Sequence, residues 1–192
     1  MEISTQTNDN INNDENEIQI QESWHTLKKL DYTNPSPFDM DEWKRCYSNC
    51  HRNYADAMTT FWEKVDLDGW SLWRGDYNYN DELRISFMVR NLVNGFIQST
   101  EDIRKWLFGV ISIRGNEDTK MFKISVFFLI RGHSINPLIE CNDGANYYTW
   151  TKLDKSSADY ETNQDLLNKY WSIEDNVSII EGENVIYSKC YK

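Results

Sequence analysis

Apolar residues recur along the chain with two different periods, which predict two kinds of element. After Asn53, apolar residues recur every three or four positions through residues 54–65, which is the spacing of an amphipathic helix. Between Phe122 and Arg131, every second residue is apolar, and the intervening positions are partly apolar as well. Such a segment is typical of a central strand that is buried on both faces.

The same criteria assign the remaining elements. Asp39 is a suitable cap for a short helix, and Ser156 or Ser157 can cap a last one around residues 166–171, because short polar side chains satisfy free amides at helix starts. The predicted helices are Asp39–Tyr47, the segment after Asn53, Ser99–Leu107 and the segment after Ser157. The predicted strands are Trp70–Tyr77, Ile85–Ile97, Phe108–Arg114, Phe122–Arg131 and Tyr147–Leu153.

This order of elements predicts an α+β fold, with helices packed on a mostly antiparallel sheet. A polar loop joins Phe108–Arg114 to Phe122–Arg131, which is typical of a β-hairpin. We expect a ferredoxin-like, split βαβ arrangement around residues 85–153.

The polar N-terminal stretch predicts a boundary between a tail and one folded domain. Residues 1–22 hold six acidic residues and no Lys or Arg, so they cannot bury enough apolar surface to offset their ordering entropy. The segment Asn34–Pro37 contains two prolines, which disfavour helix and give an extended linker. We therefore expect a disordered acidic, Asn-rich tail and linker over residues 1–37, and a folded domain over residues 38–192.

Charge narrows the class of partner. The chain has 31 Asp and Glu against 20 Lys and Arg, a net charge of −11. Broad binding to a phosphate backbone requires clustered cations, so this balance disfavours nucleic acid while leaving room for a local basic patch. It suits a protein with a basic protein partner.

The cysteines and the apolar stretches indicate a cytoplasmic protein. The N-terminus has no signal-peptide pattern, and the longest apolar stretch, Ile124–Ile130, is too short to cross a bilayer. The four cysteines are therefore expected to be free thiols in a reducing compartment. No contact with a membrane is expected.

Neither a metal site nor an active site is predicted. Cys46, Cys50 and His51 have C-x3-C-H spacing, and Cys141, Cys190 and His133 are available to complete a zinc set. Structural zinc usually has paired short spacings, so free buried thiols are the favoured interpretation. Phosphate loops, nucleophile elbows and H-E-x-x-H are absent, so we expect no cofactor and no enzymatic activity. An enzyme acting on a small molecule stays as an alternative, which predicts a deep polar pocket with perturbed carboxylates.

An aromatic cluster around Trp70 and Tyr79 has three interpretations. Core packing is the default for any single Trp, while exposed rings would stack nucleobases or anchor a protein. Arg74 is the only cation inside the cluster, which favours protein over nucleic acid. Other side chains near strand ends are available to line a shared groove. The candidate protein-binding residues are Trp70, Trp73, Arg74, Tyr77, Arg131, Tyr148 and Lys152.

Seven stretches of the chain, in order and with similar spacing, resemble the conserved C-terminal domain of the elongation factor 1 gamma family. Each stretch alone is a weak signal, but chance would have to fix both their order and their spacing. They are S-P-F-D-M-D-E-W-K-R-C-Y-S-N (Ser36–Asn49), F-W-E-K-V-D-L-D-G-W-S-L-W (Phe61–Trp73), D-Y-N-Y-N-D-E-L (Asp76–Leu83), F-M-V-R-N-L-V-N-G-F-I-Q (Phe87–Gln98), I-R-K-W-L-F-G-V (Ile103–Val110), R-G (Arg131–Gly132) and Y-T-W-T-K-L-D (Tyr148–Asp154).

The resemblance implies a non-catalytic accessory or scaffold protein of the translation elongation factor 1 complex. Its implied partners are the guanine-nucleotide exchange subunits, and the GTPase that delivers aminoacyl-tRNA and is recharged by them. The 192 residues do not include the family's N-terminal glutathione-transferase-like region. The family tends to end in a Gly-Lys-Ile-Phe-Lys-like stretch, where residues 187–192 read Tyr-Ser-Lys-Cys-Tyr-Lys. The alternative is a stand-alone RNA-associated or regulatory protein-interaction module.

Overall fold

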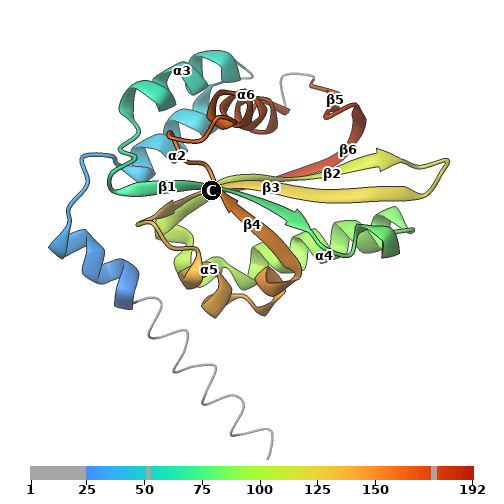
Figure 1. Cartoon of the computed structure of the whole chain (residues 1–192), viewed down its shortest axis with the longest axis horizontal. Coiled ribbons are helices and arrows are strands. Elements are labelled where there is room, and N and C mark those ends of the chain that lie inside the picture. The colour runs from blue at the N-terminus through green and yellow to red at the C-terminus, as the bar shows by residue number, and fades with distance from the viewer. Residues whose placement is uncertain (1–24, 51–52, 174–176) are drawn as a thin grey trace, which may run out of the picture.

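A six-stranded sheet lies between two layers of helices in the computed structural model, which describes residues 25–50, 53–173 and 177–192 (Figure 1). The strand order is β4-β1-β3-β2-β6-β5, and the paired strands run antiparallel. The α+β class and the antiparallel sheet predicted from the sequence are therefore confirmed. The strands are β1 (Trp70–Tyr77), β2 (Leu107–Asn116), β3 (Met121–Arg131), β4 (Tyr148–Lys152), β5 (Ile179–Ile180) and β6 (Glu183–Tyr191).

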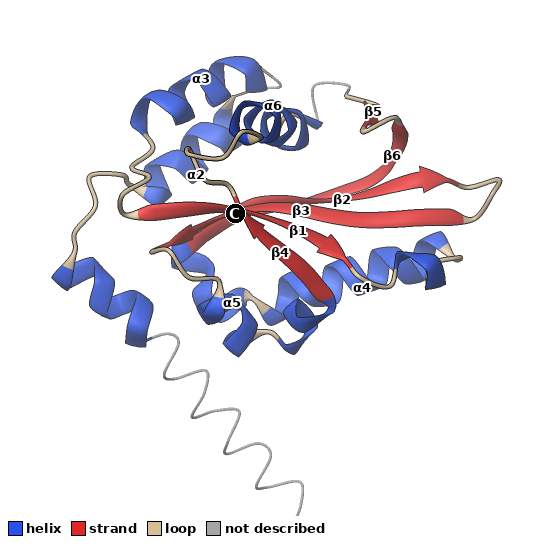
Figure 2. Cartoon of the chain, viewed as in Figure 1, coloured by secondary structure: helices blue, strands red, loops and turns tan. Residues whose placement is uncertain are grey.

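Helices cover both faces of the sheet. Figure 2 shows α2, α3 and α6 on one face, and α4 and α5 on the other. The α-helices are α2 (Met40–Asn49), α3 (Tyr54–Lys64), α4 (Ser86–Ser99), α5 (Asn136–Cys141) and α6 (Tyr160–Trp171). The 3-10 segments are η1 (Asn80–Glu82), η2 (Glu101–Trp106) and η3 (Asp143–Tyr147).

Two hydrophobic clusters, one on each face, meet at β3. Phe127 and Leu129 pack with the residues of α2, α3 and α6, while Phe128 and Ile130 pack on the α4 side. Successive side chains of a strand point to opposite faces, so a strand that is apolar at both sets of positions is covered on both. The central place of β3, between β1 and β2, confirms the prediction drawn from its continuous apolar run.

Two helical connections, β1 to β2 and β3 to β4, each join strands that are separated by one other strand in the sheet. β1 leads through α4 to β2, yet β3 lies between them in the sheet. β3 leads through α5 to β4, and β1 lies between that pair. Both connecting helices lie on the same face (Figure 1).

The strand predicted at Ile85–Ile97 is wrong, because this segment forms helix α4. Val89, Val93 and Phe96 are its buried residues, and their spacing of three and four is that of one helical face. Packing of this face on the sheet outweighs weak local preferences for an extended conformation.

The helix predicted at Ser99–Leu107 is present in a shorter and tighter form. Ser99 is the last residue of α4, η2 is a 3-10 segment without a side-chain cap, and Leu107 already belongs to β2. Ile103 and Trp106 are buried, as the predicted apolar face requires.

The packed part of the chain begins upstream of Phe38, the boundary expected from the sequence. Residues 25–33 are helical, and Leu27 is fully buried in the cluster on the α4 side. The proline-containing segment then leads into α2. The rest of the predicted tail, residues 1–24, lies outside the described residues.

Strand β6 was not expected from the sequence. It pairs along β2, from Gly109 opposite Tyr191 to Arg114 opposite Val185, with an irregularity after Ile113. Most of its side chains are only half-buried, so the alternation of apolar and polar positions that marks a strand is weak here. Tyr191 is an exception, with 2% exposure.

Candidate protein-binding site

Arg131, the last residue of β3, ties the N-terminal segment to the end of the sheet. Its side chain is buried, with 2% exposure for the residue. Its guanidinium donates hydrogen bonds to the carbonyl oxygens of Gly69, Asn34 and Leu30, the last at 3.1 Å. The guanidinium carbon lies 5.6 Å from the centroid of the Trp70 ring, within the range of a cation–π contact. A buried charge needs such partners.

Asp31 forms the second link between the N-terminal segment and the sheet. Its Oδ2 accepts hydrogen bonds from Trp106 Nε1 at 2.9 Å and Lys105 Nζ at 3.0 Å, and its Oδ1 lies 3.6 Å from Arg131 Nε. Burial alone would raise the pKa of Asp31, but these hydrogen bonds and the charges of Lys105 and Arg131 hold that pKa below its usual value. The carboxylate is therefore ionised near neutral pH.

Ser36 fixes the proline-containing segment against β1. Its Oγ donates to Asp66 Oδ2 at 2.5 Å and accepts from Trp70 Nε1 at 3.0 Å and the Phe38 amide at 3.2 Å. Burial would raise the pKa of Asp66, but its hydrogen bonds from Ser36 and from the amides of Asp68 and Gly69 lower it. One hydroxyl thus joins three segments of the chain.

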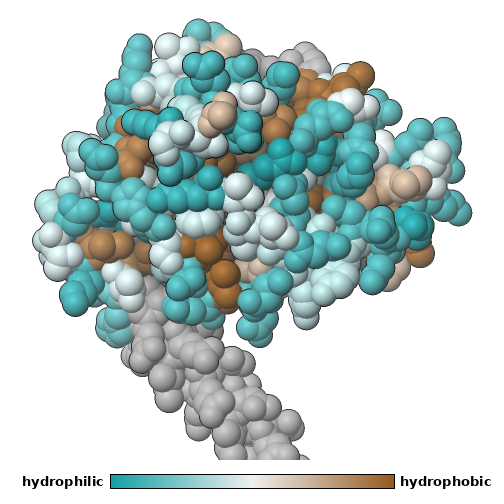
Figure 3. Space-filling model, in the orientation of Figure 1, coloured by the Kyte–Doolittle hydropathy of each residue, from teal (hydrophilic) through white to brown (hydrophobic). Residues whose placement is uncertain are grey.

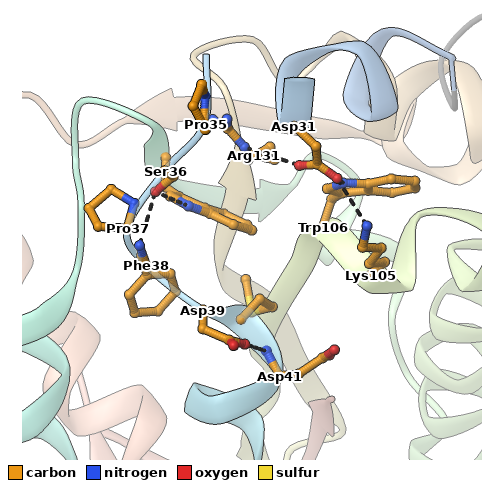
Figure 4. A pocket seen from close by; sticks show the side chains of 12 residues that line it. Asp31, Pro35, Ser36, Pro37, Phe38, Asp39, Asp41, Lys105, Trp106 and Arg131 are labelled. Carbon is orange, nitrogen blue, oxygen red and sulfur yellow. Dashed lines mark hydrogen bonds and ion pairs between the residues drawn. The ribbon is translucent and has the colours of Figure 1, made fainter. Parts of the chain in front are cut away.

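These contacts surround a pocket of about 480 Å³, which we call the Arg131 pocket. Figure 4 shows Asp31 directed toward Trp106, Lys105 and Arg131 on one side, and Ser36 beside the proline residues on the other. The pocket combines indole rings with charges of both signs, a composition that suits contact with a polypeptide. Its lining residues are Asp31, Pro35, Ser36, Pro37, Phe38, Asp39, Met40, Asp41, Trp70, Lys105, Trp106 and Arg131.

The candidate residues named from the sequence do not share one surface. Trp70 and Arg131 line the Arg131 pocket. Trp70 packs on the α2 side of the sheet, whereas Trp73 and Tyr77 pack on the α4 side, because odd and even positions of β1 face opposite ways. Tyr148 lies with Tyr77, their ring centroids 5.3 Å apart.

The two remaining candidates are cations with partners inside the chain. Arg74 forms ion pairs with Asp76 at 2.8 Å and Glu181 at 2.9 Å, so its charge is already balanced. Lys152, on the edge strand β4, is exposed, and its Nζ lies 3.1 Å from His133 Nδ1. Of the two, Lys152 has the more accessible charge.

The conserved domain of elongation factor 1 gamma matches residues 25–134 of the chain. An elongation factor 1-gamma of Prunus avium is 39% identical over 166 residues, which cover 85% of this chain and 37% of that protein. An elongation factor 1-gamma of Mus musculus is 35% identical over 159 residues, 82% of this chain and 35% of that protein. The chain belongs to the elongation factor 1 gamma family. It spans little more than a third of the length of these curated relatives.

The match to the elongation factor 1 gamma domain includes the whole Arg131 pocket. The matched range begins at the helical segment 25–33 and ends after Arg131, so the residues that line this pocket lie within it. A relative from Saccharomyces cerevisiae, elongation factor 1-gamma 2, is 31% identical over 160 residues, 83% of this chain and 36% of that protein.

Sequence reasoning named only Trp70 and Arg131 among the residues that line the pocket; those it missed include Asp31, Ser36, Lys105 and Trp106. Asp31 and Ser36 were assigned to a linker, although Leu27 and Asp31 stand four residues apart, which places them on one side of a helix. That spacing is the only signal in the sequence that would have connected Asp31 with the folded domain. Trp106 lies in the segment predicted as the helix Ser99–Leu107, and nothing in its sequence context indicates that its indole donates a hydrogen bond to Asp31.

A second surface in this elongation factor 1 gamma chain is apolar. Ile85 directly precedes α4, and Phe87, Met88 and Leu92 lie in its first half; these four residues are between 38% and 63% exposed. On the face shown in Figure 3, hydrophobic side chains form separate small areas among hydrophilic ones, which is usual for a protein surface. The α4 residues instead belong to one element, and such grouping is characteristic of surfaces that contact other proteins.

A zinc site would need several His or Cys side chains gathered in one place among the described residues. Within that part of the chain, three or more His, Cys, Asp or Glu side chains nowhere gather as a metal site. The four cysteines are free, and burial raises the pKa of the Cys141 thiol to about 12, so it is protonated near neutral pH. His51 lies outside the described residues. No helix in those described ranges is sufficiently long and apolar to span a bilayer.

Proposed function

We propose that the chain is a non-catalytic accessory protein of the translation elongation factor 1 complex and acts in the cytoplasm. In this proposal it binds the exchange subunits that recharge the aminoacyl-tRNA-delivering GTPase, or the GTPase itself. The observation that carries the proposal is the match to the elongation factor 1 gamma domain over residues 25–134, which contains a complete pocket of mixed aromatic and charged character.

The carboxylates near the pocket support a non-catalytic role. A general acid or base works best when its pKa lies near the working pH. The hydrogen bonds to Asp31 and Asp66 outweigh their burial and shift both pKa values downward, away from neutrality. Both side chains also join separate segments of the fold, so their charges serve structure.

The candidate residues named from the sequence remain proposed contact residues, although they lie at separate places on the fold. Trp70 and Arg131 line the Arg131 pocket, and Lys152 offers an exposed charge. Trp73, Tyr77 and Tyr148 would contribute from the α4 side of the sheet, and Arg74 from its place beside Glu181, with which it forms an ion pair. Trp, Tyr and Arg are the residues favoured where binding energy concentrates.

We further propose that β1–β4, with α4 and α5, form the ferredoxin-like arrangement of two split βαβ units. The order β4-β1-β3-β2 and the antiparallel pairing support it. In this view β6 and β5 extend the sheet beyond β2.

The direct test measures binding of the full chain to each purified elongation factor 1 subunit by isothermal titration calorimetry. Binding to an exchange subunit or to the GTPase is expected, and the chain alone should not accelerate nucleotide exchange. Lys152→Glu should weaken that binding about tenfold, because it reverses an exposed charge at the proposed surface. Lys189→Glu, an equal charge reversal at an exposed position of β6, serves as the control.

Two results would contradict the proposal. The first is the absence of binding to every subunit at micromolar concentrations. The second is nucleotide exchange catalysed by the chain without any partner.

A further inference from the structure

A basic groove lies between α2, η2 and Lys192. Its volume is about 760 Å³, and five of its eight lining residues are Lys or Arg, against one acidic residue, Asp41. The whole chain, in contrast, has a net charge of −11. Such local concentration of positive charge on an acidic protein marks an anion-binding surface. The lining residues are Asp41, Lys44, Arg45, Ser48, Asn49, Arg104, Lys105 and Lys192.

Lys44 lies at the inner side of this basic groove. Its Nζ donates to the carbonyl oxygen of Arg104 at 2.5 Å and lies 5.9 Å from the centroid of the Tyr191 ring. Burial, and then the charge of Arg104, lower the pKa of Lys44 to about 8, although Asp41, Glu101 and Cys190 act in the opposite direction. The positive charges are thus only partly neutralised by the fold, and a bound anion would relieve their repulsion.

Two of the five cations already have carboxylate partners, and three remain available. Arg104 pairs with Glu101 at 2.8 Å, and Lys105 pairs with Asp31 at 3.0 Å. In the described part of the chain, the ion pairs within 4.0 Å do not include Lys44, Arg45 or Lys192.

We infer that the basic groove binds a short acidic peptide segment, rich in Asp and Glu, of a partner protein. The inference goes beyond the proposed function, since the basic groove shares only Asp41 and Lys105 with the Arg131 pocket, and its occupant does not depend on the identity of the proposed partner. Carboxylates of such a segment would form ion pairs with Lys44, Arg45 and Lys192, whose charges no carboxylate of the described residues neutralises within 4.0 Å.

The charge distribution favours a short peptide over nucleic acid. Electrostatic interactions are screened over about 8 Å at physiological ionic strength, so a short segment is attracted by the groove alone. A long polyanion would extend past the groove onto the surface of a protein with 31 acidic residues, where it is repelled. Nucleic-acid binding also draws on many phosphate contacts along an extended basic surface, and the five cations here are confined to one groove.

The test uses the full chain and a fluorescein-labelled octaglutamate peptide, with fluorescence anisotropy at an ionic strength of about 0.15 M, where charges are screened over about 8 Å. The groove variant is Arg45→Glu with Lys192→Glu. The matched control is Lys120→Glu with Lys155→Glu, which alters the net charge equally at exposed positions outside the groove. Circular dichroism and a urea titration establish that both variants fold.

We expect the groove variant to bind the peptide at least about tenfold more weakly than the wild type, and the control to change by less than about threefold, because pair interactions act over short range. Octaglutamine should not bind. The inference is overturned by equal losses in both variants, by absence of octaglutamate binding, or by an oligouridylate that binds the wild type more tightly than octaglutamate.

Discussion

Glu181, in the turn between β5 and β6, and Arg114, in β2, form a short ion pair, with 2.6 Å between Oε2 and Nη1. The Arg114 side chain is only 5% exposed. Glu181 also holds Arg74 through Oε1 at 2.9 Å and accepts a hydrogen bond from Tyr170 at 3.1 Å. Its φ of 51° lies in the left-handed region, which costs a non-glycine residue about 1 kcal/mol. These contacts offset that strain and join β1, β2 and α6 to the β5–β6 turn.

Glu181→Gln should lower the free energy of unfolding by about 2 kcal/mol, because loss of one partner leaves a buried charge poorly compensated. Arg114 would retain Glu183 at 3.6 Å, which limits the loss. Urea denaturation measures the change. Glu101→Gln is the control, since its pair with Arg104 is exposed and should contribute less than about 0.5 kcal/mol. Equal effects of the two substitutions would refute this role of Glu181.

Gly109→Ala and Gly95→Ala should change stability in opposite directions. A Cβ on Gly109, in β2, would lie 2.0 Å from the carbonyl oxygen of Phe127, so the strands must separate at a cost of at least about 2 kcal/mol. A Cβ on Gly95 meets nothing within 4 Å, and Ala is favoured over Gly inside a helix by up to about 1 kcal/mol. Thermal unfolding of both variants checks this, and a destabilised Gly95→Ala protein would be inconsistent with the position of α4.

Tyr148→Phe should leave the protein as stable as before or slightly more stable. The Tyr148 hydroxyl is buried without a hydrogen-bond partner among the described residues, and an unpartnered buried hydroxyl is unfavourable. Tyr191→Phe is the matched comparison, because the Tyr191 hydroxyl donates to the Thr100 carbonyl at 2.6 Å, and its loss should cost about 1 kcal/mol. A larger loss for Tyr148→Phe than for Tyr191→Phe, measured by urea denaturation, would contradict the assignment.

Asp31 should give the protein a pH-dependent stabilisation that disappears in acid. Its pKa is lower in the folded protein than its ordinary value of 3.8, so the unfolded chain takes up the proton first as pH falls. The contribution is complete well above 3.8 and is lost as pH drops through the folded value. Asp31→Asn should therefore cost about 1 kcal/mol at pH 7, and the difference from the wild type should narrow below about pH 4.

Urea midpoints at pH 7, 5, 4 and 3 would follow this change. Asp118→Asn, at an exposed position of the β2–β3 loop, serves as the control. A constant difference between wild type and Asp31→Asn across that range would exclude the ionised carboxylate as the source of the stabilisation.

The sequence predicted elements best where burial and periodicity agree. Helix α2 begins after Asp39, whose side chain accepts hydrogen bonds from two amides of the first turn, and β3 is apolar on both faces. Helix α4 was misread because its solvent side is also apolar at Met88 and Leu92. With hydrophobic residues on both sides, the period of 3.6 is obscured and a buried strand becomes an equally good interpretation.

The candidate site was only partly predictable, for a different reason. Trp70 and Arg131 were named from the sequence and line one pocket, because they are opposite each other in the β1–β3 register. Asp31 reaches Lys105 across 74 positions of the sequence. No local pattern indicates which distant segment a partly buried carboxylate contacts, so that half of the pocket required the tertiary structure.

The pairing of β6 with β2 has a consequence for the order of events during synthesis. Arg114 lies opposite Val185, and Gly109 opposite Tyr191, so the open edge of β2 stays uncovered until translation has passed these late codons. Before that point, the edge of β2 has no strand paired with it, and the Thr100 carbonyl lacks the hydrogen bond that Tyr191 later donates. The sheet therefore reaches its full width only after residues 183–191 have been synthesised, and until then the unpaired edge of β2 is open to aggregation.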